Sequence, residues 1–175
     1  MLKSIKSIIG SRVVDFADSS TLGEVVDWVI APESKKITAF LVRPAGWFAK
    51  LAAVPSLAVI EYGPKLLIVK DPEALRQPQE IMSNPKSISQ KIHLLGSPVI
   101  TSKGRKLGLA EDLLFETSDT TIQKLYITPD LINKFHQPDL IITANRIVNI
   151  LPNKIVVEED GAETSRVQQI AESKA

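Results

Sequence analysis

Two aspartates, Asp27 and Asp112, are the residues whose type and placement best suit chemistry. Each interrupts a strongly apolar stretch of the chain. Two carboxylates brought together in a cleft could act as a general acid and base, because their pKa values would separate. A carboxylate within an apolar strand can equally be structural, since it needs hydrogen-bond donors such as turn amides or an arginine. We interpret both as structural carboxylates, because the same residue type recurs in both stretches, and keep the paired acid as the alternative.

The remaining reactive side chains form no recognisable catalytic or metal-binding pattern. The chain has no cysteine, which excludes disulfides, thiolate metal sites and a cysteine nucleophile. His93 and His136 stand alone, without the spacing of metal ligands. Residues 102–108 are rich in glycine and lysine but lack the spacing of a phosphate-binding loop, so a hairpin turn explains them better. We therefore expect no catalytic residue, no metal, no cofactor and no enzymatic activity.

The stretches around the two aspartates belong to one pattern that occurs twice. Residues 22–44 and 107–129 align without a gap. The identical pairs are Leu22 and Leu107, Gly23 and Gly108, Asp27 and Asp112, Ile37 and Ile122, and Pro44 and Pro129. An internal repeat of this kind predicts two similar structural units. The expected division is a first domain at 1–70, a linker at 71–92, a second domain at 93–158 and a polar tail at 159–175.

The elements that must position these residues are short strands. Apolar, β-branched runs alternate with turn clusters, and no long helical pattern is present, which indicates an all-β protein built from small barrels or sandwiches. Gly23 and Gly108 lie within long strands, where glycine marks a bulge or a tight bend. A small barrel needs such bends to turn its strands around corners. The proline-rich linker is expected to be partly helical.

A loop with two adjacent aromatic residues, Trp47 and Phe48, is the candidate partner-binding surface. Aromatic side chains supply large contact areas and often anchor interfaces. The alternative is that both rings close one end of the first barrel. A face carrying several cations is a second candidate, for RNA, and consists of Lys3, Lys6, Arg12, Lys35 and Lys36.

The repeated pattern resembles the PRC-barrel family. The resemblance lies in a glycine-containing strand, a polar turn, a returning strand and a final apolar strand. In the first copy these are residues 22–27, 37–42 and 64–69. In the second copy they are Leu107–Gly108 with Asp112, residues 122–127 and residues 154–157. The loop 45–48 resembles that of bacterial proteins with two tandem PRC-barrels. The resemblance implies two PRC-type barrels related by pseudo-twofold symmetry.

The same resemblance implies a role in docking other macromolecules. The family includes the C-terminal domain of the ribosome maturation factor RimM and the cytoplasmic part of the photosynthetic reaction-centre H subunit. We therefore expect a non-catalytic adaptor or scaffold that binds a protein partner. An RNA- or ribosome-associated maturation factor is the alternative, and an assembly factor for photosynthetic complexes is the second alternative.

Overall charge and hydropathy narrow these expectations only a little. The formal net charge is +1, so there is no global attraction to nucleic acid or to an anionic membrane. No apolar run reaches the roughly 18 residues expected of a membrane-spanning helix. We expect a cytoplasmic chain without a membrane span, and leave open whether it forms a homodimer.

Overall fold

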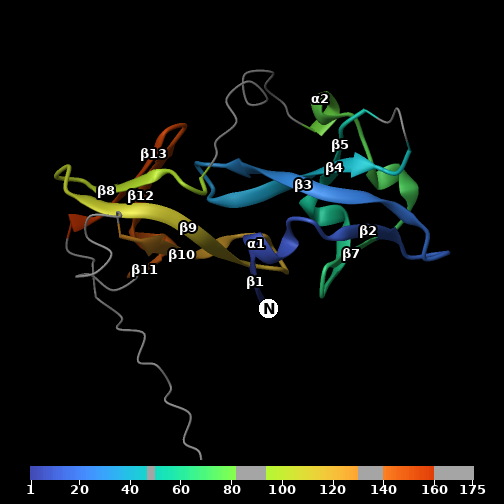
Figure 1. Cartoon of the computed structure of the whole chain (residues 1–175), viewed down its shortest axis with the longest axis horizontal. Coiled ribbons are helices and arrows are strands. Elements are labelled where there is room, and N and C mark those ends of the chain that lie inside the picture. The colour runs from blue at the N-terminus through green and yellow to red at the C-terminus, as the bar shows by residue number, and fades with distance from the viewer. Residues whose placement is uncertain (47–49, 82–93, 130–139, 160–175) are drawn as a thin grey trace, which may run out of the picture. The chain divides into compact units, whose positions relative to one another are not determined.

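The computed structural model of the chain describes residues 1–46, 50–81, 94–129 and 140–159 (Figure 1). Strands dominate these residues, and the two α-helices, α1 (Ile5–Ile8) and α2 (Pro78–Ile81), are each a single turn. The prediction of an all-β protein is therefore confirmed. The chain divides into two compact units: Met1–Ile92 with Leu114–Ile122, and His93–Leu113 with Gln123–Ala175.

The first unit contains a six-stranded sheet in the order β5-β4-β3-β2-β7-β6. The strands are β2 (Arg12–Asp15), β3 (Thr21–Ala31), β4 (Lys36–Pro44), β5 (Ala52–Pro55), β6 (Val59–Gly63) and β7 (Leu66–Val69). Neighbouring strands are antiparallel except β2 and β7, which are parallel. Within the described residues β5 and β6 end the sheet, so its hydrogen bonding does not close into a ring.

The second unit repeats this strand order. The main path of its sheet runs β11-β10-β9-β8-β13-β12, and β13 is parallel to β8 as β7 is to β2. The strands are β8 (Pro98–Thr101), β9 (Lys106–Glu116), β10 (Ile122–Thr128), β11 (Leu140–Thr143), β12 (Ile147–Leu151) and β13 (Lys154–Val157). A 3₁₀ turn precedes the last hairpin in both units, at Ser56–Ala58 and at Ala144–Arg146. The repeat therefore extends over the whole strand topology and not only over its best-matching residues.

The alternation of apolar residues along the strands explains how the core forms. In β7, for example, Leu67 and Val69 are fully buried while Leu66 and Ile68 are partly exposed. One face of each strand therefore contributes to the interior, as the period of two requires. The entry helix adds Ile5 and Ile8, spaced three apart so that both point the same way and are buried.

The tip of the second long hairpin belongs to the first unit. The short strand β1 (Leu2–Ser4) pairs with the end of β9, with Lys3 opposite Phe115. Phe115 is fully buried, and its ring lies 6.4 Å from that of Phe40 and 5.7 Å from that of Tyr62. Rings at such separations and tilted angles attract one another beyond simple burial of area. Residues 1–92 alone therefore lack part of this unit's core.

Most strands in the first unit lie close to where the sequence places them. The returning strand expected at 37–42 lies within β4, and the final apolar segment expected at 64–69 contains β7. The sequence did not predict β1 and β5, which are short and carry no clear alternation. The expected linker contains the 3₁₀ turn Pro72–Ala74 and α2, and its residues 82–92 lie outside the described residues.

Candidate binding surfaces

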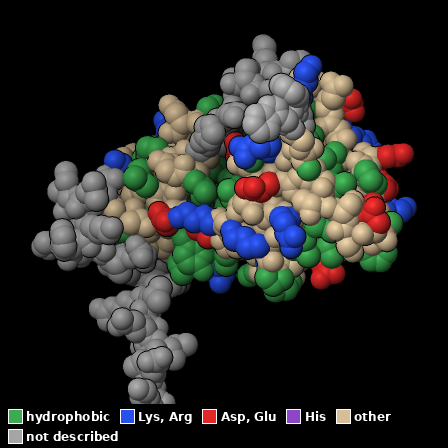
Figure 2. All heavy atoms as spheres, turned by 45° about the vertical axis from the view of Figure 1, so that its right-hand side comes forward, with side chains coloured by type: hydrophobic (Ala, Val, Ile, Leu, Met, Phe, Trp, Pro, Cys, Tyr) green, Lys and Arg blue, Asp and Glu red, His purple; other side chains and the backbone are tan. Residues whose placement is uncertain are grey.

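Three exposed apolar side chains of the first unit lie at or beside one end of strands β2, β7 and β6. Phe16, just beyond β2, is 67% exposed, and Ile60 in β6 is 53% exposed. Leu57, in the 3₁₀ turn that leads into β6, is 80% exposed. We call Phe16, Leu57, Ile60 and the half-buried Ile68 the first-unit apolar face. Figure 2 shows hydrophobic side chains reaching the surface between charged ones.

Strand pairing explains why these side chains point outward together. Asp15, Val69 and Val59 pair across the three strands, and all three are buried. Because successive side chains alternate between the faces of a sheet, Phe16 and Ile68 point to the face opposite this row, where Val14 of β2 is buried. The Phe16 amide donates to the Val69 carbonyl at 2.9 Å, which holds Phe16 beside the end of β7.

A bulge places Ile60 on this surface. The pairing of β6 with β7 shifts between Val59 and Glu61, so Ile60 is the additional residue. A bulge commonly redirects a side chain or interrupts pairing at a sheet edge. The second unit has the same shift, which makes Val148 the additional residue and leaves it 48% exposed.

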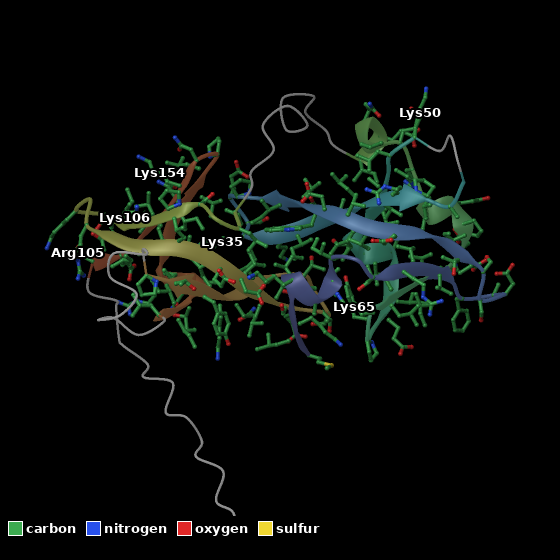
Figure 3. All side chains as sticks on the ribbon, in the orientation of Figure 1. Lys35, Lys50, Lys65, Arg105, Lys106 and Lys154 are labelled. Atoms are coloured by element: carbon green, nitrogen blue, oxygen red, sulfur yellow. The ribbon has the colours of Figure 1, made fainter. Side chains whose placement is uncertain are left out.

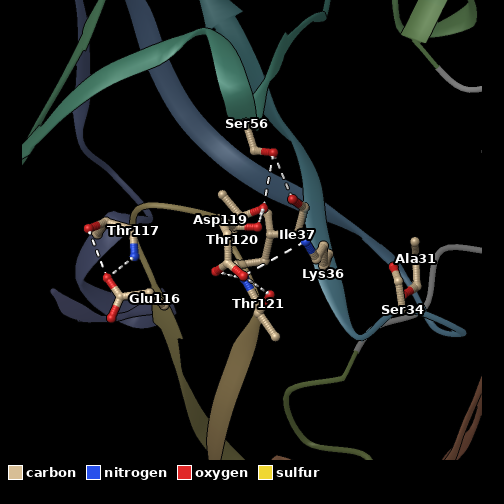
Figure 4. Close-up of polar contacts among 10 residues, drawn as sticks. All are labelled: Ala31, Ser34, Lys36, Ile37, Ser56, Glu116, Thr117, Asp119, Thr120 and Thr121. Carbon is tan, nitrogen blue, oxygen red and sulfur yellow. Dashed lines mark hydrogen bonds and ion pairs between the residues drawn. The ribbon is translucent and has the colours of Figure 1, made fainter.

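A polar turn joins the two long hairpins within the first unit (Figure 4). The Ile37 amide donates to the Thr120 carbonyl at 3.0 Å, and the Ile122 amide donates to the Lys35 carbonyl at 2.9 Å. Lys36 pairs with Thr121 between these bonds. Lys35 and Thr120 occupy equivalent positions in the repeat, and both have left-handed backbones, with φ of 53° and 59°. The two turns thus use the same geometry and exchange equivalent hydrogen bonds.

Ser56 reinforces this junction from the first unit. It is 4% exposed, and its Oγ donates to the Ile37 carbonyl at 2.7 Å and lies 3.5 Å from the Thr120 hydroxyl. Across the turn, the Thr121 hydroxyl donates to Asp119 at 2.6 Å, and the Lys36 ammonium lies 3.8 Å from the same carboxylate. These contacts satisfy buried polar groups, which indicates a structural junction.

The electrostatics of this region follow from its hydrogen bonds. The Thr121 hydroxyl, the Thr121 amide and the Lys36 charge together lower the pKa of Asp119 from its ordinary value. A hydrogen bond from the N-terminal ammonium of Met1 is the largest cause that lowers the pKa of Glu116. Burial raises the pKa of Tyr62 well above its ordinary value, so Tyr62 stays neutral in the core.

The two structural carboxylates sit in equivalent local environments. The Asp27 carboxylate accepts from the Trp28 amide at 2.9 Å, and the Asp112 carboxylate accepts from the Leu113 amide at 2.8 Å. Each lies in a long strand and is half-buried. This local bonding supports the structural interpretation of the sequence. The two residues lie in separate compact units.

Gly23 and Gly108 each stand where the opposing strand approaches closely. A Cβ on Gly23 would lie 2.5 Å from the Arg43 carbonyl oxygen, and a Cβ on Gly108 would overlap the Thr128 carbonyl oxygen. The pairing with β2 or β8 shifts by one residue beside each glycine. Gly108 also has φ of 150°, which side chains rarely allow. Glycine is thus required in both copies by backbone proximity.

Residues 2–76 match the PRC-barrel domain family. This match covers less than half of the chain and spans the first copy of the repeat. For the second half, likeness to the PRC-barrel rests on the repeated sequence and strand order. No curated protein matches the chain.

The PRC-barrel match stops short of the structural unit. It ends at Arg76, whereas the first unit also includes Leu114–Ile122 with the buried Phe115. Pseudo-twofold symmetry between two whole barrels stays a prediction, as does the exact division into 1–70, 71–92, 93–158 and 159–175.

Several residues singled out in the sequence lie outside the described residues. These are Trp47, Phe48, His93 and His136. The aromatic loop therefore stays a prediction. The apolar face was missed, although Phe16 and Ile60 are large apolar residues beside turn signals, because sequence alone does not show which side of a strand is covered.

The cationic face is not a free basic surface. Lys36 pairs with Asp119, while Lys6 and Lys35 also have interaction partners. Among the described residues, no group of three or more His, Cys, Asp or Glu side chains is arranged to hold a metal ion. Within the same residues, no helix is long and apolar enough to cross a membrane.

Proposed function

We propose that this PRC-barrel protein is a non-catalytic adaptor that binds the apolar surface of a protein partner through its first-unit apolar face. The observation that carries the proposal is the clustering of Phe16, Leu57 and Ile60 at neighbouring strand ends, each more than half exposed. Monomeric proteins seldom expose adjoining large apolar side chains without an interaction to serve. An exposed aromatic ring such as that of Phe16 suits an interface anchor.

Comparison with the second copy supports this assignment. Ser102 and Phe16 are equivalent, since the amide of each donates to the last residue of the parallel strand, Val157 or Val69. Asn145 stands where the first copy has Leu57 in the 3₁₀ turn. The fold therefore accepts polar residues at both positions, and the apolar residues of the first copy are not needed for folding.

The test is an affinity capture with the full chain from lysate of the native host, run with and without nuclease treatment. The variant combines Phe16→Ser with Ile60→Ser, and Val148→Ser is the matched control at the equivalent bulge. We expect the wild type and the control to retain the same proteins, and the double variant to lose them by about tenfold or more. Circular dichroism checks that all three chains are folded.

Three outcomes would overturn the proposal. Equal capture by the double variant would remove the apolar face as the binding surface. Capture of particles that disappears on nuclease treatment would favour the RNA- or ribosome-associated alternative. Light scattering that shows a dimer in the wild type and a monomer in the double variant would make a second copy of this chain the occupant.

A further inference from the structure

The end of the second unit is held against a basic surface by two consecutive glutamates. Glu158 Oε2 lies 3.8 Å from Arg146 Nε, and Glu159 Oε1 lies 3.5 Å from Arg105 Nε. The Glu158 amide also donates to the Arg146 carbonyl at 2.9 Å. Glu158 and Glu159 thus lie beside cationic side chains.

The turn between β8 and β9 is arranged around the Glu159 carboxylate. The buried Thr101 hydroxyl accepts from the Arg105 amide at 3.1 Å and also hydrogen-bonds Glu159. The Thr101 bond is the largest cause that lowers the pKa of Glu159, followed by the charges of Arg105 and Lys103. Figure 3 shows Arg105 and Lys106 projecting from this turn.

The Glu159 carboxylate is incompletely bonded in this turn. Its second oxygen, Oε2, is buried and accepts no hydrogen bond from the described residues. The Arg105 side chain is still 57% exposed, and an exposed ion pair of this length contributes little to stability. A single glutamate therefore binds this turn weakly. A peptide segment with several carboxylates would form ion pairs with more of the turn's basic side chains.

We propose that residues 101–106 form a docking site for an acidic peptide segment of a partner protein, and that Glu159 fills this site until the partner displaces it. A peptide carboxylate is the ligand that the structure already shows there, which favours an acidic protein segment over nucleic acid. Cations concentrated on one turn also speed the encounter with an oppositely charged partner.

The first copy shows that this arrangement is not a requirement of the fold. Asp15 stands at the position of Thr101, since Asp15 pairs with Val69 as Thr101 pairs with Val157. The two residues after that paired strand are Lys70 and Asp71 in the first copy, against two glutamates in the second. The basic turn and its glutamates are thus special to the second unit. This inference goes beyond the proposed function, because different residues carry it.

The experiment measures fluorescence anisotropy of a labelled hexaglutamate peptide with the full chain at low ionic strength. Glu159→Gln is expected to tighten binding about threefold or more, because a competing internal ligand lowers apparent affinity by the fraction of open sites. Lys103→Gln with Arg105→Gln is expected to weaken binding about tenfold. The matched control, Lys124→Gln with Lys154→Gln, removes the same charge elsewhere in this unit and should change affinity less than threefold.

Each contrary result is decisive. Unchanged peptide affinity in Glu159→Gln would show that Glu159 does not occupy the docking site. Equal weakening by both double variants would show attraction by net charge alone. An RNA oligonucleotide of the same charge that displaces the peptide at equal concentration would make the turn a nucleic-acid site. None of these results bears on the first-unit apolar face.

Discussion

The two copies of the repeat share their internal geometry and differ on their surfaces. Both have a glycine facing the opposing backbone, an aspartate bound to the next amide, a left-handed residue at the hairpin turn and a bulge in the last hairpin. On the outside, the first copy carries Phe16 and Leu57 where the second has Ser102 and Asn145. Positions shared by both copies therefore serve the fold, and positions that differ are the places to look for separate binding roles.

The largest expected effect comes from Phe115, which the second copy's hairpin contributes to the first unit. Phe115→Ala should lower the free energy of unfolding by about 3–5 kcal/mol, because it removes a fully buried ring and leaves a cavity beside Phe40 and Tyr62. Denaturant-induced unfolding measures this loss of unfolding free energy. Leu109→Ala in the same strand is the control, since Leu109 is 36% exposed and should cost about 1 kcal/mol or less. Equal costs would contradict the assignment of the hairpin tip to the first core.

The two strand glycines give a direct comparison between copies. Gly23→Ala and Gly108→Ala should each destabilise the protein by about 1–3 kcal/mol, because the new Cβ would meet the opposing backbone. Gly108→Ala should cost more, since its positive φ adds backbone strain. Gly63→Ala is the control, because its Cβ would meet Leu66 at an ordinary 3.4 Å. The melting temperatures of the three variants rank these effects. An unchanged melting temperature in Gly108→Ala would show that the two strands can move apart.

The smallest effect concerns the hairpin turns, where Asp119 stands in the second copy and Ser34 in the first. Hydrogen bonds from Thr121 lower the pKa of Asp119 in the folded chain, so its stabilising effect is present above the unfolded-state pKa of roughly 3.9. That effect is lost as the pH falls through the lower folded-state pKa. Thr121→Val should raise the pKa of Asp119, as followed by carboxyl chemical shifts in an NMR titration. Lys124→Gln serves as the control, and an unchanged pKa in Thr121→Val would contradict the role of the hydroxyl.

The sequence predicted the repeated strands because they leave a local signal. The constant offset between the two copies, for example between Gly23 and Gly108, is visible in the sequence. So is the apolar strand at Leu66–Val69, whose side chains alternate in burial. The burial of Phe115 among residues of the other copy could not be predicted, because it depends on which distant strands meet. The exposure of Phe16 and Ile60 likewise depends on strand pairing and on a bulge, which a linear pattern does not reveal.

The position of the hairpin tip also sets the order in which the protein can fold during synthesis. Residues 1–92 emerge first, yet their unit takes in residues up to Ile122. At about 5–20 residues per second, the nascent first unit waits on the order of seconds for the ring of Phe115 and the turn that follows it. During that interval the rings of Phe40 and Tyr62 lack their aromatic neighbour. We expect this incomplete chain to bind chaperones, and slow translation to prolong the exposure of its core.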